Sequence, residues 1–239
     1  DDLAGRTRSS GAELRRSIAD ARKATVEFVA WLQAQAPSKT GPSGVGKEAY
    51  DWNLRHVHLV PLTWDQEVML LQRELARSHA SLRFEEQRNR GLPQLTAASS
   101  PEEWDQRANA AVTKYLAWLK SKDILGVDDY LDPALRERIG PYAPPETRNF
   151  FGIASHYEPI TLFAHFQHWF DHAWLKNAPN PSVIRREAWL NNVWDSRAEG
   201  FATGFEEILL HAGLFDERPR AQELIYVMLA NRAARAMGD

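Results

Sequence analysis

Apolar residues recur every three to four positions along most of this 239-residue chain, which is the spacing of helices with one buried face. Residues 11–35 follow this spacing. Residues 36–46 interrupt it with two prolines and three glycines, and a short helix is predicted over 47–55. Because no alternating strand pattern persists beyond a few residues, the chain is predicted to be all-α.

Two helix starts carry a capping-box pattern, a hydroxyl residue followed three positions later by Gln or Glu. Thr63-Trp-Asp-Gln66 is the first, and Ser100-Pro-Glu-Glu103 is the second, with proline at the first helical position. We therefore predict that long helices begin after Thr63 and Ser100, the second running to about residue 121.

The second half of the chain is predicted to hold three more long helices after a broken stretch at 123–151. They start at 159, at 181 and at 216, and prolines 179 and 181 separate the first from the second. We expect one multi-helix domain over 1–239, with N-terminal helices in 1–122 and the helices of a candidate metal site in 156–239.

Composition narrows the classes of partner. The formal charge is only −3 with both signs interspersed, so a nucleic-acid surface is not expected. No apolar run reaches the roughly 20 residues of a membrane span, and no targeting segment is visible, which leaves a cytoplasmic or a periplasmic or secreted location open. There are no cysteines, so a metal must be held by His, Asp or Glu.

His165, His168 and His172 form the strongest candidate site. On one continuous helix they lie within an arc of roughly 60°, and residues 149–175 contain no Lys or Arg that would repel a cation. Three imidazoles on one face are typical of a metal site that activates water. The alternative is an amphipathic helix whose histidines pack at a helix interface.

Glu199 and Glu206 are the candidate acidic partners, seven residues apart on the next helix. Glu199 is a candidate metal ligand, and Glu206 is a candidate that orients a ligand or accepts a proton. Asp171, in the His-x-x-Asp-His pattern ending at His172, is a second candidate proton acceptor. The alternative is a solvated acidic stripe, against which Gly200 and Gly204 indicate close approach of another backbone.

Three segments together resemble a known family. They are Gly46-Lys-Glu-Ala-Tyr50, the segment Glu199-Gly-Phe-Ala-Thr-Gly-Phe-Glu206, and Arg232-Ala-Ala-Arg235-Ala-Met-Gly-Asp239. The second is similar to the Glu-Gly-Trp-Ala-x-x-x-Glu motif of a large bacterial family of unknown function related to gluzincin metallopeptidases. The resemblance implies a helical, zinc-dependent fold in which Glu199 is the third zinc ligand. Without the resemblance, Arg232 and Arg235 are interpreted as an exposed ionic face.

The chain departs from the family at its main motif, His-Glu-x-x-Pro-Gly-His. With His172 placed on the last His, Phe166 and Gln167 stand where the first His and the general base belong. A further His of the family follows the position of Asp239, so we expect a fragment or one chain of a larger protein, with a companion chain or the rest of the protein as partner.

The functional expectation is a metal-dependent hydrolase, peptidase- or amidase-like, acting on a small molecule or peptide. Zinc or another divalent ion would be held by a set of four candidate ligands: His165, His168, His172 and Glu199. Two alternatives stay open. One is a metal-free, degenerate family member that serves as a binding or assembly subunit. The other is a metal-dependent lyase, which suits the loss of a hydrolytic base.

Overall fold

The computed structural model describes residues 5–41, 43–186 and 198–238. Every regular element in these ranges is helical and none is a strand, so the all-α prediction is confirmed. None of the described helices combines the length with the apolar character that a bilayer span requires.

The contacts divide the chain into two compact units, residues 1–46 and residues 47–239. The first unit contains α2 (Ala12–Gln35) and the 3-10 turn η1 (Ala36–Ser38), after which the expected loop begins. A division by contacts does not test whether the two units fold as one domain, so the single domain over 1–239 stays a prediction.

The second unit carries the remaining described helices. In chain order these are α3 (Lys47–Asn53), the π-helix η2 (Leu54–His58), α4 (Trp64–Arg88), α5 (Pro101–Lys122), α6 (Leu131–Arg136), the 3-10 turn η3 (Pro145–Thr147), α7 (Phe150–Tyr157), α8 (Pro159–His165), α9 (Gln167–Asn177), α10 (Val183–Arg186), α12 (Phe201–His211) and α13 (Pro219–Gly238).

The predicted capping boxes start α4 and α5. Thr63 Oγ1 accepts a hydrogen bond from the Gln66 amide, and the Gln66 side chain accepts one from the Thr63 amide, so the first box is complete. Ser100 likewise accepts from the amide of Glu103. The Glu103 carboxylate, however, accepts from the amide of Ser99 rather than from that of Ser100.

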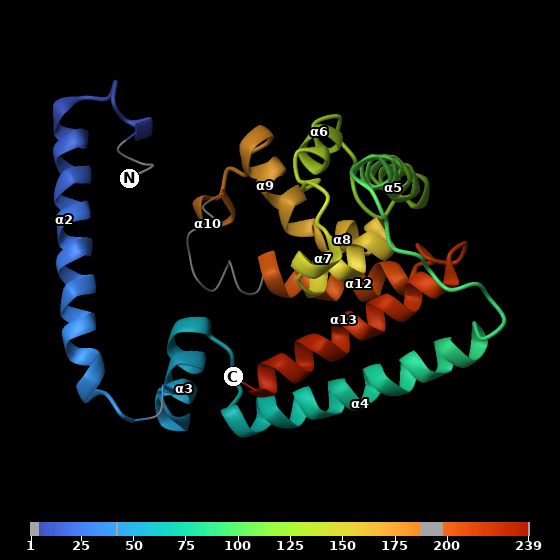
Figure 1. The fold of residues 1–239 in the computed structure, drawn as a ribbon, viewed down its shortest axis with the longest axis horizontal. Helices are drawn as coiled ribbons and strands as arrows, with labels where there is room; N and C mark the ends of the chain where they lie inside the picture. Colours follow the sequence, from blue (N-terminus) through green and yellow to red (C-terminus); the bar gives the residue numbers. More distant parts are fainter. Residues whose placement is uncertain (1–4, 42, 187–197, 239) are drawn as a thin grey trace. The chain divides into compact units, whose positions relative to one another are not determined.

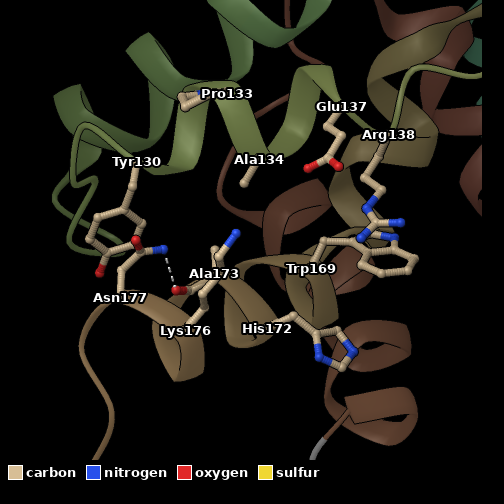
Figure 2. A pocket seen from close by; sticks show the side chains of 10 residues that line it. All are labelled: Tyr130, Pro133, Ala134, Glu137, Arg138, Trp169, His172, Ala173, Lys176 and Asn177. Atoms are coloured by element: carbon tan, nitrogen blue, oxygen red, sulfur yellow. Dashed lines mark hydrogen bonds between the residues drawn. The ribbon is translucent and has the colours of Figure 1, made fainter. Parts of the chain in front are cut away.

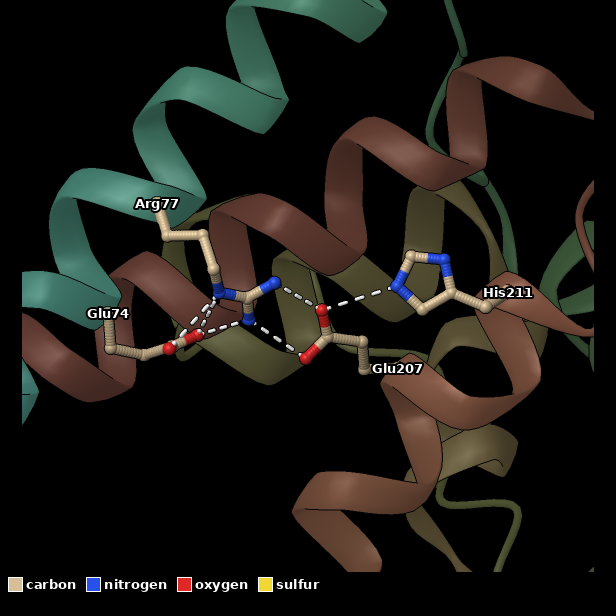
Figure 3. Close-up of polar contacts among 4 residues, drawn as sticks. All are labelled: Glu74, Arg77, Glu207 and His211. Atoms are coloured by element: carbon tan, nitrogen blue, oxygen red, sulfur yellow. Dashed lines mark hydrogen bonds and ion pairs between the residues drawn. The ribbon is translucent and has the colours of Figure 1, made fainter.

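α4 and α13 lie side by side and antiparallel, forming the most extensive helix pair of the described chain (Figure 1). At one end, Asn89 Nδ2 donates to the carbonyl of Pro219 over 3.1 Å. Arg77 of α4 binds Glu74 on its own helix and Glu207 of α12 (Figure 3), which ties the pair to the rest of the unit. The hydrogen bonds and charge of Arg77, together with those of His211, lower the pKa of Glu207.

The main core lies between α5, α6, α8, α9, α12 and α13. Its members are large apolar side chains from segments far apart in the sequence, and burial of each stabilises the fold by about 1.5–3 kcal/mol. The fully buried members include Tyr115, Leu131, Phe163, Phe170, Leu209 and Ile225. This core holds α8, α9 and α12, which carry the candidate site.

Two predicted helices differ from the structure. The histidine helix is divided into α8 and α9 at Phe166, and the last helix begins at Pro219 rather than at 216. The helix predicted over 181–212 cannot be followed as one element, because residues 187–197 lie outside the described ranges. α10 and α12 occupy its two ends.

Candidate functional site

The break at Phe166 changes how the three histidines are arranged. His165 is the last residue of α8, whereas His168 and His172 belong to α9. His168 Nδ1 lies 3.0 Å from the carbonyl of His165, and because a carbonyl only accepts, this nitrogen carries the proton. The prediction of one continuous helix with three histidines inside a 60° arc is therefore wrong. The His168 ring instead satisfies a carbonyl that the break leaves without an intrahelical partner.

His165 lies against the first of the predicted acidic partners. Its Nδ1 atom is 2.8 Å from Glu206 Oε1, and only 14% of its side chain is exposed. The ring N–H does not point at that oxygen, so the contact is an ion pair when the ring is protonated, not an aligned hydrogen bond. The rest of the ring stacks against Phe151, with centroids 6.2 Å apart.

Glu206 is fully buried, and both of its oxygens are held by Arg232 of α13. The two guanidinium nitrogens donate to the two oxygens over 2.7 Å each. Such two-point charge-assisted pairs are among the strongest hydrogen bonds in proteins. Glu206 is therefore not part of a solvated acidic stripe, and Arg232 does not lie on an exposed ionic face. On α12, which carries Glu206, the apolar Phe201 and Ile208 are exposed instead.

A pocket of about 370 Å³ opens beside this pair, and we call it the His165 pocket. Its walls come from α7, α8, α12 and α13 and from the π-helical residues 198–200 that precede α12. The lining residues are Phe151, His165, Glu199, Thr203, Arg232, Arg235 and Ala236. Two predicted site residues, His165 and Glu199, therefore line one cavity, with Glu206 buried behind it. The sequence analysis did not include Arg232 and Arg235 in the candidate site, although both belong to the segment Arg232–Asp239 that resembles the family.

His168 is packed next to His165, with ring centroids 5.0 Å apart. Burial lowers its pKa, and the nearby charge of His165 lowers it further, while the charge of Glu199 acts in the opposite direction. His168 therefore favours the neutral form, which is the form that binds metals.

His172 lies in a different cavity, the Trp169 pocket of about 350 Å³ between α6 and α9 (Figure 2). The Arg138 guanidinium stacks on the Trp169 ring at 3.8 Å, and His172 lies beside the same ring. Asp171, its neighbour on α9, lines neither this pocket nor the His165 pocket. His165 and His172, two of the candidate ligands, thus line different cavities.

Across residues 5–41, 43–186 and 198–238, no three side chains of His, Asp, Glu or Cys come close enough together to hold one ion. His165, His168 and Glu199 lie near one another without converging on a point in this arrangement, so zinc binding and the catalytic roles of Asp171 and Glu206 stay predictions.

Gly204 of α12 does not lie against another backbone, although its place inside a helix predicts such an approach. A Cβ placed on Gly204 would meet no atom within 4 Å, so this glycine does not mark a tight backbone contact.

Comparison with protein-family models, with curated proteins and with solved structures gave no match. The resemblance to the gluzincin-related family therefore stays a prediction.

Proposed function

We propose that the His165 pocket binds a small molecule or peptide that carries both a carboxylate and an amino group, such as an amino acid or a chain terminus. The observation that carries this proposal is a pair of opposite charges on its walls. Arg235 is exposed and Glu199 is half-buried, both line the cavity, and within the described residues no ion pair joins them. A ligand with both charges would satisfy each wall.

The remaining walls suit such a ligand. Arg232 uses two of its five N–H donors on Glu206, which leaves donors for a carboxylate. The Phe151 ring and Ala236 supply apolar surface, and Thr203 supplies a hydroxyl. A volume of about 370 Å³ is within the range of sites for small ligands.

The test is a calorimetric titration with free amino acids and dipeptides, beside analogues blocked at the amino or the carboxyl end. Binding of the free forms, with loss on blocking either end, is the expected result. Arg235→Ala should remove the preference for a free carboxylate, and Glu199→Gln the preference for a free amine. The matched control is Arg90→Ala, an exposed arginine outside the pocket. Equal binding of free and blocked ligands, or no binding of either, would contradict the proposal.

A second candidate is metal-dependent hydrolysis of the same ligand class. The adjacency of His165, His168 and Glu199 favours it, with the Glu206 carboxylate behind His165 in the place of a group that orients a ligand. A bound zinc would supply an activated water. This function requires the three donors to move together when the ion enters.

Metal content separates the two candidates. The protein is dialysed against zinc, and bound metal is measured by elemental mass spectrometry for the wild type and for His165→Ala/His168→Ala. Near-stoichiometric zinc that the double variant loses supports the hydrolase. Absence of zinc from both, with ligand binding intact, leaves the binding function alone.

A further inference from the structure

Three cationic side chains converge on another cavity of the second unit, which we call the Lys114 pocket. Arg107 and Lys114 come from α5, and Arg218 comes from the turn between α12 and α13. Seven residues are nearly two helical turns, so the first two lie on the same face of α5. The alanines between them on the pocket wall leave a cavity of about 410 Å³.

A buried carboxylate, Glu158, is the common neighbour of these cations. Its side chain is fully buried, and its Oε2 atom lies 2.6 Å from Arg218. Burial raises the pKa of Glu158, while the charges of Arg218, Lys114 and Arg107 oppose that shift. Three cations are therefore grouped around one interior anion.

The other carboxylate partners of the cations differ in exposure, with Glu217 at the surface and Glu103 half-buried. Lys114 contacts Glu217 at 2.7 Å, and the Glu217 side chain is 80% exposed. Arg107 contacts Glu103 and donates to the carbonyl of Thr96. Exposed ion pairs stabilise a fold by only about 0–1 kcal/mol, because water competes for both charges. A ligand anion would therefore displace Glu217 from Lys114 at small cost.

We propose that the Lys114 pocket binds an oxyanion with two negative charges, and a small phosphate monoester is the ligand class that fits it. Each arginine has five N–H donors and uses only some of them on Thr96, Glu103 or Glu158, so the rest can bind phosphate oxygens, and a lysine adds a mobile point charge. Tyr157 and Ile160, which also line the pocket, provide surface for the organic part of the ester. This site is separate from the His165 pocket, and its occupancy does not depend on the function proposed there.

The experiment titrates the full chain with inorganic phosphate and with phenyl phosphate at constant ionic strength, using calorimetry. Acetate, which has one charge, is the comparison ligand. Lys114→Ala should weaken phosphate binding about tenfold or more, the loss expected for one charge-assisted hydrogen bond. Lys120→Ala is the matched control, because it removes the same charge from an exposed position of α5 outside the pocket.

A second variant shifts affinity in the opposite direction. Glu217→Gln removes the exposed competitor of Lys114 without touching the core, so phosphate should bind more tightly than to the wild type. Arg218 is left intact, since its loss would leave Glu158 buried without its ion-pair partner. Failure of phosphate to bind, equal losses in Lys114→Ala and Lys120→Ala, or acetate binding as tightly as phosphate would overturn the proposal.

Discussion

His156 and His165 are both mostly buried in the second unit, and the surroundings of their rings differ. His156 stacks on Trp104 with centroids 4.2 Å apart and an interplanar angle of 9°. Its Nδ1 donates to the Gly152 carbonyl over 2.7 Å, and its Nε2 accepts from the Ala143 amide over 3.3 Å. Both ring nitrogens are used within the protein, and only the neutral ring makes both bonds.

At His165 one nitrogen faces the charged pair of Glu206 and Arg232, and the ring lines a cavity. The comparison teaches that burial alone does not separate a structural histidine from a candidate binding residue. What separates them is whether the second ring nitrogen is already satisfied by the fold.

The largest effect is expected from breaking the charged pair behind His165. Arg232→Met leaves Glu206 buried without its cation, which should lower the free energy of unfolding by about 3–5 kcal/mol. Urea denaturation measures it. The control is Arg77→Met, whose guanidinium is more exposed and whose loss should cost about 1 kcal/mol (Figure 3). Equal losses in the two variants would show that the cost of removing the arginine does not depend on the burial of the Glu206 carboxylate.

A smaller effect is expected from removing the structural ring. His156→Ala loses the stacking on Trp104 and leaves the Ala143 amide without its partner, so it should destabilise the unit by about 2–4 kcal/mol. Ligand binding at the His165 pocket should be unchanged. His165→Ala should do the reverse, with a smaller loss of stability and weaker binding. Urea denaturation measures the stability of both variants, and calorimetric titration of the folded proteins measures their binding. A binding defect in His156→Ala alone would contradict the comparison.

The smallest effect is expected from pH. Burial lowers the pKa of His156, and the positive charge of Arg148 lowers it further, with Tyr142 as the other titratable neighbour. The unfolded chain, with a His pKa near 6.5, then binds the proton more readily. The stability that His156 supplies is present above about pH 6.5 and falls as the pH drops toward its lowered folded pKa. Urea denaturation across this range should show wild type and His156→Gln converging on acidification; a constant difference would count against it.

Helix starts were predictable because their signals are local. Thr63 and Gln66 fix the start of α4 through bonds within one turn, and Ser100 does the same for α5. The break at Phe166 was not predictable, because neither proline nor glycine marks it. Its geometry depends on the His168 side chain and on packing around Phe163 and Phe170.

The candidate site was predictable only in part for the same reason. Glu199 and His165 were selected from residue type and spacing, and they do line one cavity. The partner of Glu206 is Arg232, 26 residues away on another helix, and no spacing rule reports such a contact.

The pairing of α4 with α13 also has a consequence for synthesis of the chain. Asn89 and Pro219, which join the two helices at one end, are 130 residues apart in sequence. α4 therefore leaves the ribosome long before its partner is translated, and the side that α13 covers stays open during that interval. Closing so long a loop has a large entropic cost, so this pair should form late. Until translation reaches α13, the uncovered side of α4 is open to aggregation, which a chaperone would prevent.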